Sequence, residues 1–114
     1  MRIALSCTKN DINARFDRRF GRCPWFLVWD TLLLKGQFVR NHPADKEDDA
    51  GVNAAALLAS HKVQRVFASD YGKLAAAALR KQGIEMFLLR DEGVGLLDIL
   101  KLRKKDFSLE TDVV

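Results

Sequence analysis

Short apolar runs separated by polar segments predict five strands in this chain. The runs at residues 2–7, 25–29, 37–41, 63–68 and 84–89 are rich in β-branched, aromatic and aliphatic side chains, which is the composition of buried strands. Segments rich in alanine and leucine at 51–60, 73–82 and 96–103 predict three helices. The first three strands follow one another without a helix between them, and the last two alternate with the helices.

This order predicts a single-domain α/β fold. Strands that alternate with helices run parallel through right-handed crossovers, whereas a helix-free succession of strands favours antiparallel pairing. We therefore expect a mixed sheet of about five strands with helices on its faces. The domain is expected to span residues 1–105, followed by a loose C-terminal tail at 106–114. The acidic stretch at 45–49 is expected to be a solvated loop with the character of a helix N-cap.

Composition places the chain among small globular proteins. Of its 114 residues, 48% are hydrophobic, which is enough to fill a core. The net charge of +4 is modest for a dedicated nucleic-acid binder. The sequence has no apolar run long enough for a membrane span, no signal-peptide pattern at its start, and two cysteines rather than a disulfide framework. We therefore expect a reduced, cytoplasmic protein.

The predicted strand directions bring four polar residues to one edge of the sheet. This edge holds the end of the first strand, the start of the second and the ends of the third and fourth, and open α/β sheets bind ligands there. The four residues are Cys7, Cys23, His42 and Asp70. The helix N-termini near Gly51, Gly72 and Gly95 are expected to face the same edge, where their free N–H groups favour anions.

The long loop between the first two strands adds positive charge to this edge. It contributes Arg15, Arg18, Arg19 and Arg22. Because Arg22 directly precedes Cys23, we expect arginine charge to favour the Cys23 thiolate, the form that ligates metals. Cys7 and His42 complete a predicted set of soft ligands. Each also has an ordinary structural interpretation, Cys7 as a small buried hydrophobe and His42 as a loop residue.

Several catalytic and nucleotide-binding motifs are missing from the sequence. It contains neither the GxxxxGK[ST] phosphate loop nor the GxGxxG dinucleotide fingerprint. It also lacks the GxSxG nucleophile elbow, the HExxH zinc pair and any CxxC pair. With two histidines in the chain, no nucleophile and base can be paired. We therefore expect a binding protein rather than an enzyme.

One motif points to a known family. The stretch from Arg19 to Phe26 reads Arg-Phe-Gly-Arg-Cys-Pro-Trp-Phe. It resembles the RFGRxxxF signature of the dinitrogenase iron–molybdenum cofactor family, the NifX-type nitrogenase accessory proteins. Shorter matches lie at 1–6, 41–43, 51–55 and 69–72, so the resemblance covers residues 1–105.

The resemblance implies a fold and a function. The fold is a three-layer ribonuclease H-like domain whose second strand is antiparallel to the rest. The function is non-enzymatic binding or transport of an iron–sulfur or iron–molybdenum-type metallocluster, or its precursor, held transiently and passed to a protein partner in cofactor assembly. Nuclease activity is not implied, because the first strand has no metal-binding carboxylate among residues 3–5.

The motif also assigns roles to individual residues. On the matching positions, Arg19 and Arg22 would neutralise an anionic cluster and Cys23 would ligate its metal. Cys7 or His42 is the candidate second ligand, on the argument from the sheet edge alone. The backbone at Gly51 and Gly72 would supply further N–H donors.

Two other functions stay open from the sequence. In the first, the protein is a metal-free module for a small anion or a protein partner, recognised by the arginines, and Cys23 is incidental. In the second, the arginine-rich loop binds single-stranded nucleic acid, with Phe16, Phe20 and Trp25 as stacking platforms. The modest net charge argues against this second alternative.

Overall fold

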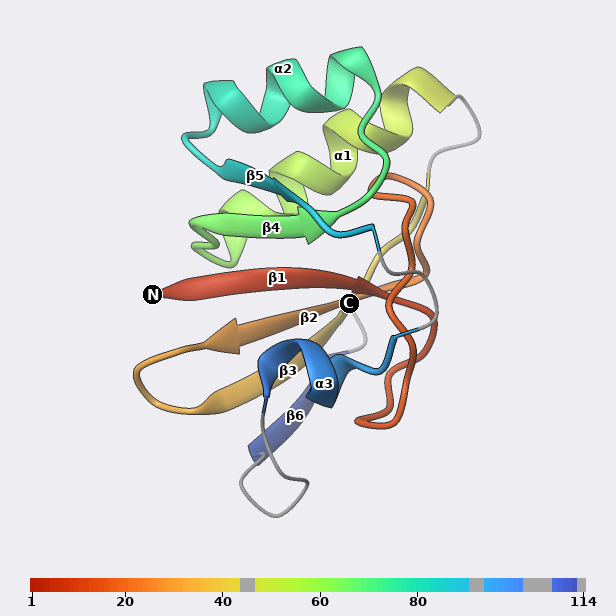
Figure 1. Cartoon of the computed structure of the whole chain (residues 1–114). Helices are drawn as coiled ribbons and strands as arrows, with labels where there is room; N and C mark the ends of the chain where they lie inside the picture. Colours follow the sequence, from red (N-terminus) through yellow and green to blue (C-terminus); the bar gives the residue numbers. More distant parts are fainter. Residues whose placement is uncertain (44–46, 91–93, 102–107, 113–114) are drawn as a thin grey trace.

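One mixed sheet, flanked by helices, forms the centre of the molecule (Figure 1). The computed structural model describes residues 1–43, 47–90, 94–101 and 108–112. The strands are β1 (Arg2–Cys7), β2 (Trp25–Asp30), β3 (Lys35–Arg40), β4 (Arg65–Ala68), β5 (Glu85–Leu88) and β6 (Ser108–Asp112). The helices are α1 (Glu47–Ser60), α2 (Lys73–Lys81) and α3 (Leu96–Leu100). Within the described ranges, no helix has the length and apolar character that crossing a membrane requires.

The strand order is β5-β4-β1-β2-β3-β6. β2 runs antiparallel to both of its neighbours, and every other neighbouring pair is parallel. At the carboxyl end of β1, Cys7 pairs with Trp25 at the start of β2, and Trp25 pairs with Arg40 at the end of β3. The predicted α/β class and the ribonuclease H-like strand arrangement are therefore confirmed, and the predicted edge exists.

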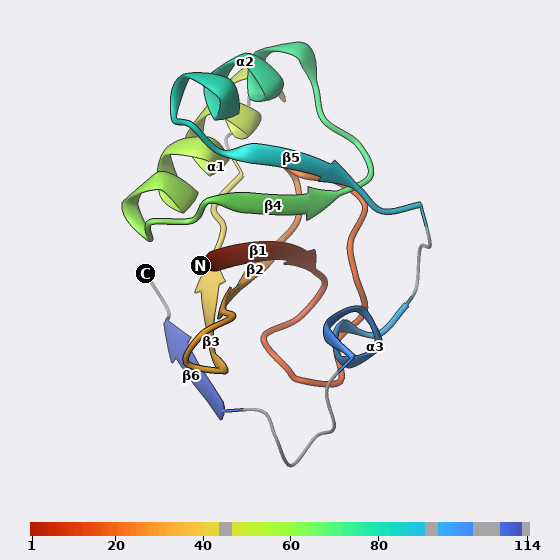
Figure 2. The same cartoon turned by 60° about the vertical axis from the view of Figure 1, so that its left-hand side comes forward.

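The sheet separates two hydrophobic cores. Successive residues of a strand point to opposite faces, so Ala4 of β1 lies in one core and Leu5 in the other. α1 and α2 cover the first face and bury Leu58 and Leu79 there. α3 covers part of the second face through Leu96. Figure 2 shows α1 and α2 on one side of the sheet and α3 on the other, which gives the three expected layers.

Some boundaries differ from the prediction. α1 begins at Glu47 instead of residue 51, so residues 47–49 of the acidic stretch, expected to be a loop with N-cap character, already belong to the helix. Acidic residues stabilise the N-terminus of a helix through its dipole, which explains the earlier start. β3 begins at Lys35 instead of residue 37. α3 ends at Leu100, where Lys101 adopts a left-handed conformation with φ 55°, and predicted helical residues 102–103 lie outside the described residues.

The expectation of a loose tail is wrong for residues 108–112. They form β6, which pairs in parallel with β3 and extends the sheet beyond the five predicted strands. The sequence Ser-Leu-Glu-Thr-Asp has no apolar run that predicts a strand. The edge of β3 supplies the hydrogen-bond partners instead, because an open strand edge is a template for a further strand.

Candidate anion-binding site

Residues 18–23, which we call the arginine turn, are tied to the end of β4 by main-chain hydrogen bonds. The N–H groups of Ser69 and Asp70 donate to the carbonyl oxygen of Arg18, at 3.0 and 2.9 Å. The N–H group of Phe20 donates in return to the carbonyl oxygen of Asp70, at 3.2 Å. The arginine turn therefore lies at the predicted edge of the sheet, next to Asp70.

Phe20 anchors the arginine turn in the core. Its side chain is 1% exposed, and its ring packs against Phe26 and Tyr71 with centroid distances of 5.6 and 5.5 Å. Phe16 is also buried, and the guanidinium of Arg40 lies over the ring of Trp25. The prediction that Phe16 and Phe20 offer stacking surfaces to nucleic-acid bases is therefore wrong.

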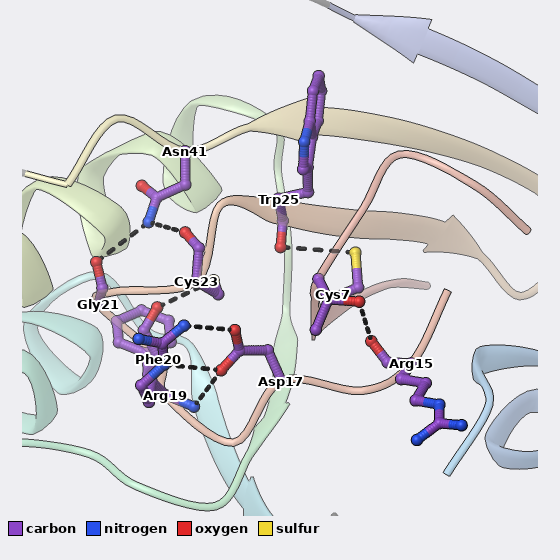
Figure 3. Close-up of polar contacts among 10 residues, drawn as sticks. Cys7, Arg15, Asp17, Arg19, Phe20, Gly21, Cys23, Trp25 and Asn41 are labelled. Atoms are coloured by element: carbon purple, nitrogen blue, oxygen red, sulfur yellow. Dashed lines mark hydrogen bonds and ion pairs between the residues drawn. The ribbon is translucent and has the colours of Figure 1, made fainter. Parts of the chain in front are cut away.

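Asn41 holds the arginine turn from the end of β3 (Figure 3). Its side-chain Nδ2 donates to the carbonyl oxygens of Gly21 and Cys23, at 3.1 and 2.8 Å. Its own N–H group donates to the carbonyl oxygen of Pro24 at 2.9 Å. The sequence assigns no role to Asn41, and its one signal there is its place in the short match at residues 41–43.

A cavity of about 340 Å³ opens beside the arginine turn, within the size range of small-ligand sites. Its lining residues are Arg18, Arg19, Phe20, Gly21, Arg22, Ala50, Gly51, Asp70, Gly72, Lys73, Leu74 and Ala75. Four of these described residues are cationic and one, Asp70, is acidic. This excess of positive charge creates a positive potential in the cavity, which favours an anionic ligand.

The N-terminus of α2 adds hydrogen-bond donors to the cavity. Gly72 caps this helix, no side chain bonds to the first N–H groups, and the first turn has no acidic residue. The first helical bond runs from the N–H group of Ala76 to the carbonyl oxygen of Gly72, at 2.9 Å. The N–H groups of residues 73–75 thus have no partner within the helix. A Cβ atom added at Gly72 would meet nothing within 4 Å, so the backbone there borders open space.

Gly51 lines the cavity but does not begin a helix. Because α1 starts at Glu47, the N–H group of Gly51 falls within the helical bonding pattern and is not free for an anion. Its lack of a side chain serves packing instead. A Cβ atom added at Gly51 would lie 2.4 Å from the Cβ atom of Ala75 in α2. The expected anion-binding role of the Gly51 N–H group is therefore wrong.

Asp17 lies beside Arg19, and hydrogen bonds join the two side chains (Figure 3). The Nε and Nη2 atoms of Arg19 donate to the two carboxylate oxygens of Asp17, at 3.1 and 2.9 Å, and the backbone N–H group of Arg19 donates to Oδ1 at 3.0 Å. Burial would raise the pKa of Asp17, but the hydrogen bonds from Arg19 together with the charges of Arg19 and Arg18 outweigh burial and hold the pKa below its ordinary value. The same bonds raise the pKa of Arg19.

Cys7 and Cys23 are free thiols with no exposed surface. The Sγ atom of Cys23 donates to the carbonyl oxygen of Phe20 at 3.3 Å. Burial raises the pKa of Cys23, the neighbouring Cys7 and Asp17 raise it further, and Ser6 and Arg19 lower it by less. Burial is also the main cause of the raised pKa of Cys7. Arg19 therefore favours the Cys23 thiolate as expected, but burial outweighs this charge, so the residue is held as a protonated thiol.

The structure brings together some of the predicted site residues and leaves others apart. Those that line the cavity are Arg19, Arg22, Gly51, Gly72 and Asp70. Cys7 and Cys23 lie in the cores instead, and His42 is exposed beyond β3. Among the described residues, no group of three or more histidine, cysteine or acidic side chains is arranged to hold a metal ion. Metal ligation by Cys7, Cys23 and His42 stays a prediction.

The fold and the cavity together define a class of protein: a ribonuclease H-like α/β domain with a cationic cavity at the edge where β1, β3 and β4 end. The family model described as dinitrogenase iron-molybdenum cofactor matches residues 1–102, and the chain belongs to this family. No curated protein matches the chain.

Two solved structures are similar to this chain over most of their length. The apo form of the orange protein from Desulfovibrio gigas has 27% sequence identity and a TM-score of 0.79, with 88% of this chain and 83% of that chain covered. A putative NifB protein from Thermotoga has 26% identity and a TM-score of 0.73, with 88% and 84% covered. Both likenesses agree with the family assignment.

Proposed function

We propose that this protein binds and carries an anionic metal–sulfur cluster, or a precursor of one, in the cavity beside the arginine turn. The observation that carries the proposal is the convergence of Arg18, Arg19, Arg22 and Lys73 on one cavity that has a single acidic lining residue in the described chain. Iron–sulfur and iron–molybdenum clusters are anionic as a rule, so a cationic cavity suits them.

The comparisons support the same class of guest. The family is described by the iron–molybdenum cofactor of dinitrogenase, and the similar orange protein was solved in an apo form. The guest would be cargo for this chain, taken up and released, rather than a resident group. A partner in cofactor assembly would supply or receive it.

The donor set determines how such cargo would be held. Guanidinium and backbone N–H groups donate hydrogen bonds to sulfide or oxo ligands, and they do not ligate metal ions. Arg19, Arg22 and the first N–H groups of α2 would therefore neutralise and orient a cluster that brings its own ligands. Ligation by Cys23 would require the arginine turn to open, because its thiol is buried against Phe20.

Anaerobic reconstitution with iron, sulfide and an excess of dithiothreitol, whose thiolates supply the terminal ligands, tests the proposal. Wild type, the double variant Arg19→Ala/Arg22→Ala and Cys23→Ala are compared by iron analysis and visible absorption. Arg80→Ala is the matched control, since it removes an exposed cation from the far end of α2. We expect stoichiometric uptake in wild type, Cys23→Ala and Arg80→Ala, and a loss of about tenfold or more in the double variant, because two charge-assisted contacts disappear.

The other outcomes point to different functions. Loss of uptake in Cys23→Ala with retention in the arginine double variant would make Cys23 the ligand, as the sequence predicts. No specific uptake in any variant would contradict a cluster carrier. In that case, binding of inorganic sulfate to wild type, abolished in the arginine double variant, would identify a metal-free anion module.

A further inference from the structure

Asp17 is buried next to the arginine turn, and the proposed function gives it no role. The side chain of Asp17 is 6% exposed and does not line the cavity, whereas that of Arg19 is 54% exposed and does. The N–H group of Asp17 donates to the carbonyl oxygen of Ser6 in β1, at 2.8 Å. Asp17 is therefore fixed to the central strand and faces away from any guest.

Three hydrogen bonds from Arg19 to the carboxylate of Asp17 hold Arg19 in place. Two come from the guanidinium, at 3.1 and 2.9 Å, and the third comes from the Arg19 backbone at 3.0 Å. The guanidinium has five N–H donors, so three remain for a guest. An arginine held at two points keeps its plane and direction, whereas a free arginine side chain samples many rotamers.

We propose that Asp17 is a positioning residue, which orients Arg19 so that its remaining donors are ready for the anionic guest. This inference rests on the proposed function. Orientation in advance removes part of the ordering cost of binding, and one immobilised side chain is worth about three- to tenfold in affinity. Asp17 also cancels part of the arginine charge, so the inference requires that orientation outweighs this cancellation.

A double-mutant cycle separates the two effects. The probe is tetrathiomolybdate, a coloured molybdenum–sulfur dianion, and its dissociation constant is measured for wild type, Asp17→Asn, Arg19→Ala and the double variant. We expect Asp17→Asn to weaken binding by about three- to tenfold in the wild-type background, and by less than about twofold when Arg19 is already alanine. Such coupling shows that Asp17 acts through Arg19.

The lysine variant of Arg19 provides a second test that does not depend on folding of Asp17→Asn. Arg19→Lys keeps the positive charge but cannot form the two-point contact with Asp17. We expect it to bind the probe about as weakly as Asp17→Asn does. Thermal unfolding of every variant shows whether a loss of binding comes from a loss of fold.

Four results would overturn the inference. Equal or tighter binding by Asp17→Asn would show that charge cancellation dominates, and an equal loss in both backgrounds would show that Asp17 acts on the fold. Unchanged binding by Arg19→Lys would show that orientation is unimportant. Wild type that binds no tetrathiomolybdate would defeat the inference, and the proposed function as well if reconstitution also yields no cluster, whereas the first three results defeat the inference alone.

Discussion

Cys23 follows Arg22 in the chain, yet its thiol faces the core and donates to the carbonyl oxygen of Phe20. Burial destabilises the charged thiolate more than the nearby guanidinium of Arg19 stabilises it. The pKa of Cys23 therefore lies above its ordinary value. The order of residues shows which charges are close, but it does not show which way a side chain turns. For this reason the sequence predicts a reactive thiol where the structure has an inert one.

Thiol reactivity follows from this burial. We expect neither Cys7 nor Cys23 of the native protein to react with an aromatic disulfide reagent between pH 7 and pH 9, because a raised pKa keeps both as protonated thiols and burial blocks access. Both should react within minutes once the chain is unfolded in guanidinium. Absorbance of the released thiolate measures the reaction, and rapid labelling of one thiol in the native state would contradict the burial of that residue.

Among the elements, α1 and α2 approach each other unusually closely at Gly51 and Ala75. An added Cβ atom at Gly51 would lie 2.4 Å from the Cβ atom and 3.1 Å from the Cα atom of Ala75. The atoms in the way are the Cβ atom and the backbone of Ala75, which cannot turn aside as a long side chain would. The clash is therefore relieved only if the two helices separate. Because both helices also border the cavity, their separation would widen the site.

A single methyl group should therefore destabilise the protein. Alanine in place of glycine favours a helix by about 1 kcal/mol, but overpacking costs about 1–3 kcal/mol. We expect Gly51→Ala to lower the free energy of unfolding by up to about 2 kcal/mol, measured by urea denaturation. Gly72→Ala is the control, because an added Cβ atom there has open space. Alanine is a poorer N-cap than glycine, but it also lowers the entropy of the unfolded chain, and the two effects nearly cancel, so we expect a change of less than about 0.5 kcal/mol. Equal effects of the two substitutions would refute this account.

The local pattern of apolar residues is sufficient to predict those elements whose own sequences are markedly apolar. β1, β2, β4 and α2 lie close to the predicted ranges because the strands contain short apolar runs and the helix is rich in alanine and leucine. β6 has no such signal in its sequence, and it is a strand because the edge of β3 is available. The early start of α1 depends on acidic residues, which the sequence equally allows in a loop. Long-range pairing and helix ends are therefore the parts that local pattern does not fix.

The whole molecule concentrates a modest charge in one place. The chain carries a net charge of only +4, but four cationic side chains line a cavity of about 340 Å³. Topology causes this concentration, because β1, β3 and β4 end at the same edge and the arginine turn crosses it. Average charge is therefore a poor guide to the binding potential of this protein.

Guest binding should depend on ionic strength for the same reason. We expect the affinity for tetrathiomolybdate to fall by about tenfold between 50 mM and 500 mM sodium chloride, since the screening length shrinks to a few ångströms over this range. The Arg19→Ala/Arg22→Ala variant should show a shallower dependence. Titration at four salt concentrations measures both slopes, and a flat response in wild type would contradict electrostatic capture.

The candidate site was predictable where it depends on strand direction. Arg19, Arg22, Asp70 and Gly72 meet at one edge because the connections between the predicted strands set their directions. The hydrogen bonds of Asn41, at 2.8–3.1 Å, join it to residues 18 and 20 positions away, and those between Asp17 and Arg19 depend on how the chain bends between neighbours, which residue spacing does not show. The supporting layer of the site therefore required coordinates.

The close contacts of Gly21 and Gly51 limit which substitutions can persist as the protein evolves. An added Cβ atom at Gly21 would lie 2.9 Å from the backbone nitrogen of Gly51, and one at Gly51 would meet Ala75. The arginine turn, α1 and α2 thus touch in series at three small residues that are far apart in the sequence. A lineage that enlarges one of these positions has to move the segment that it touches, and Gly51 touches both of the others. Descendants of this protein should keep or lose all three small residues together, as one heritable unit.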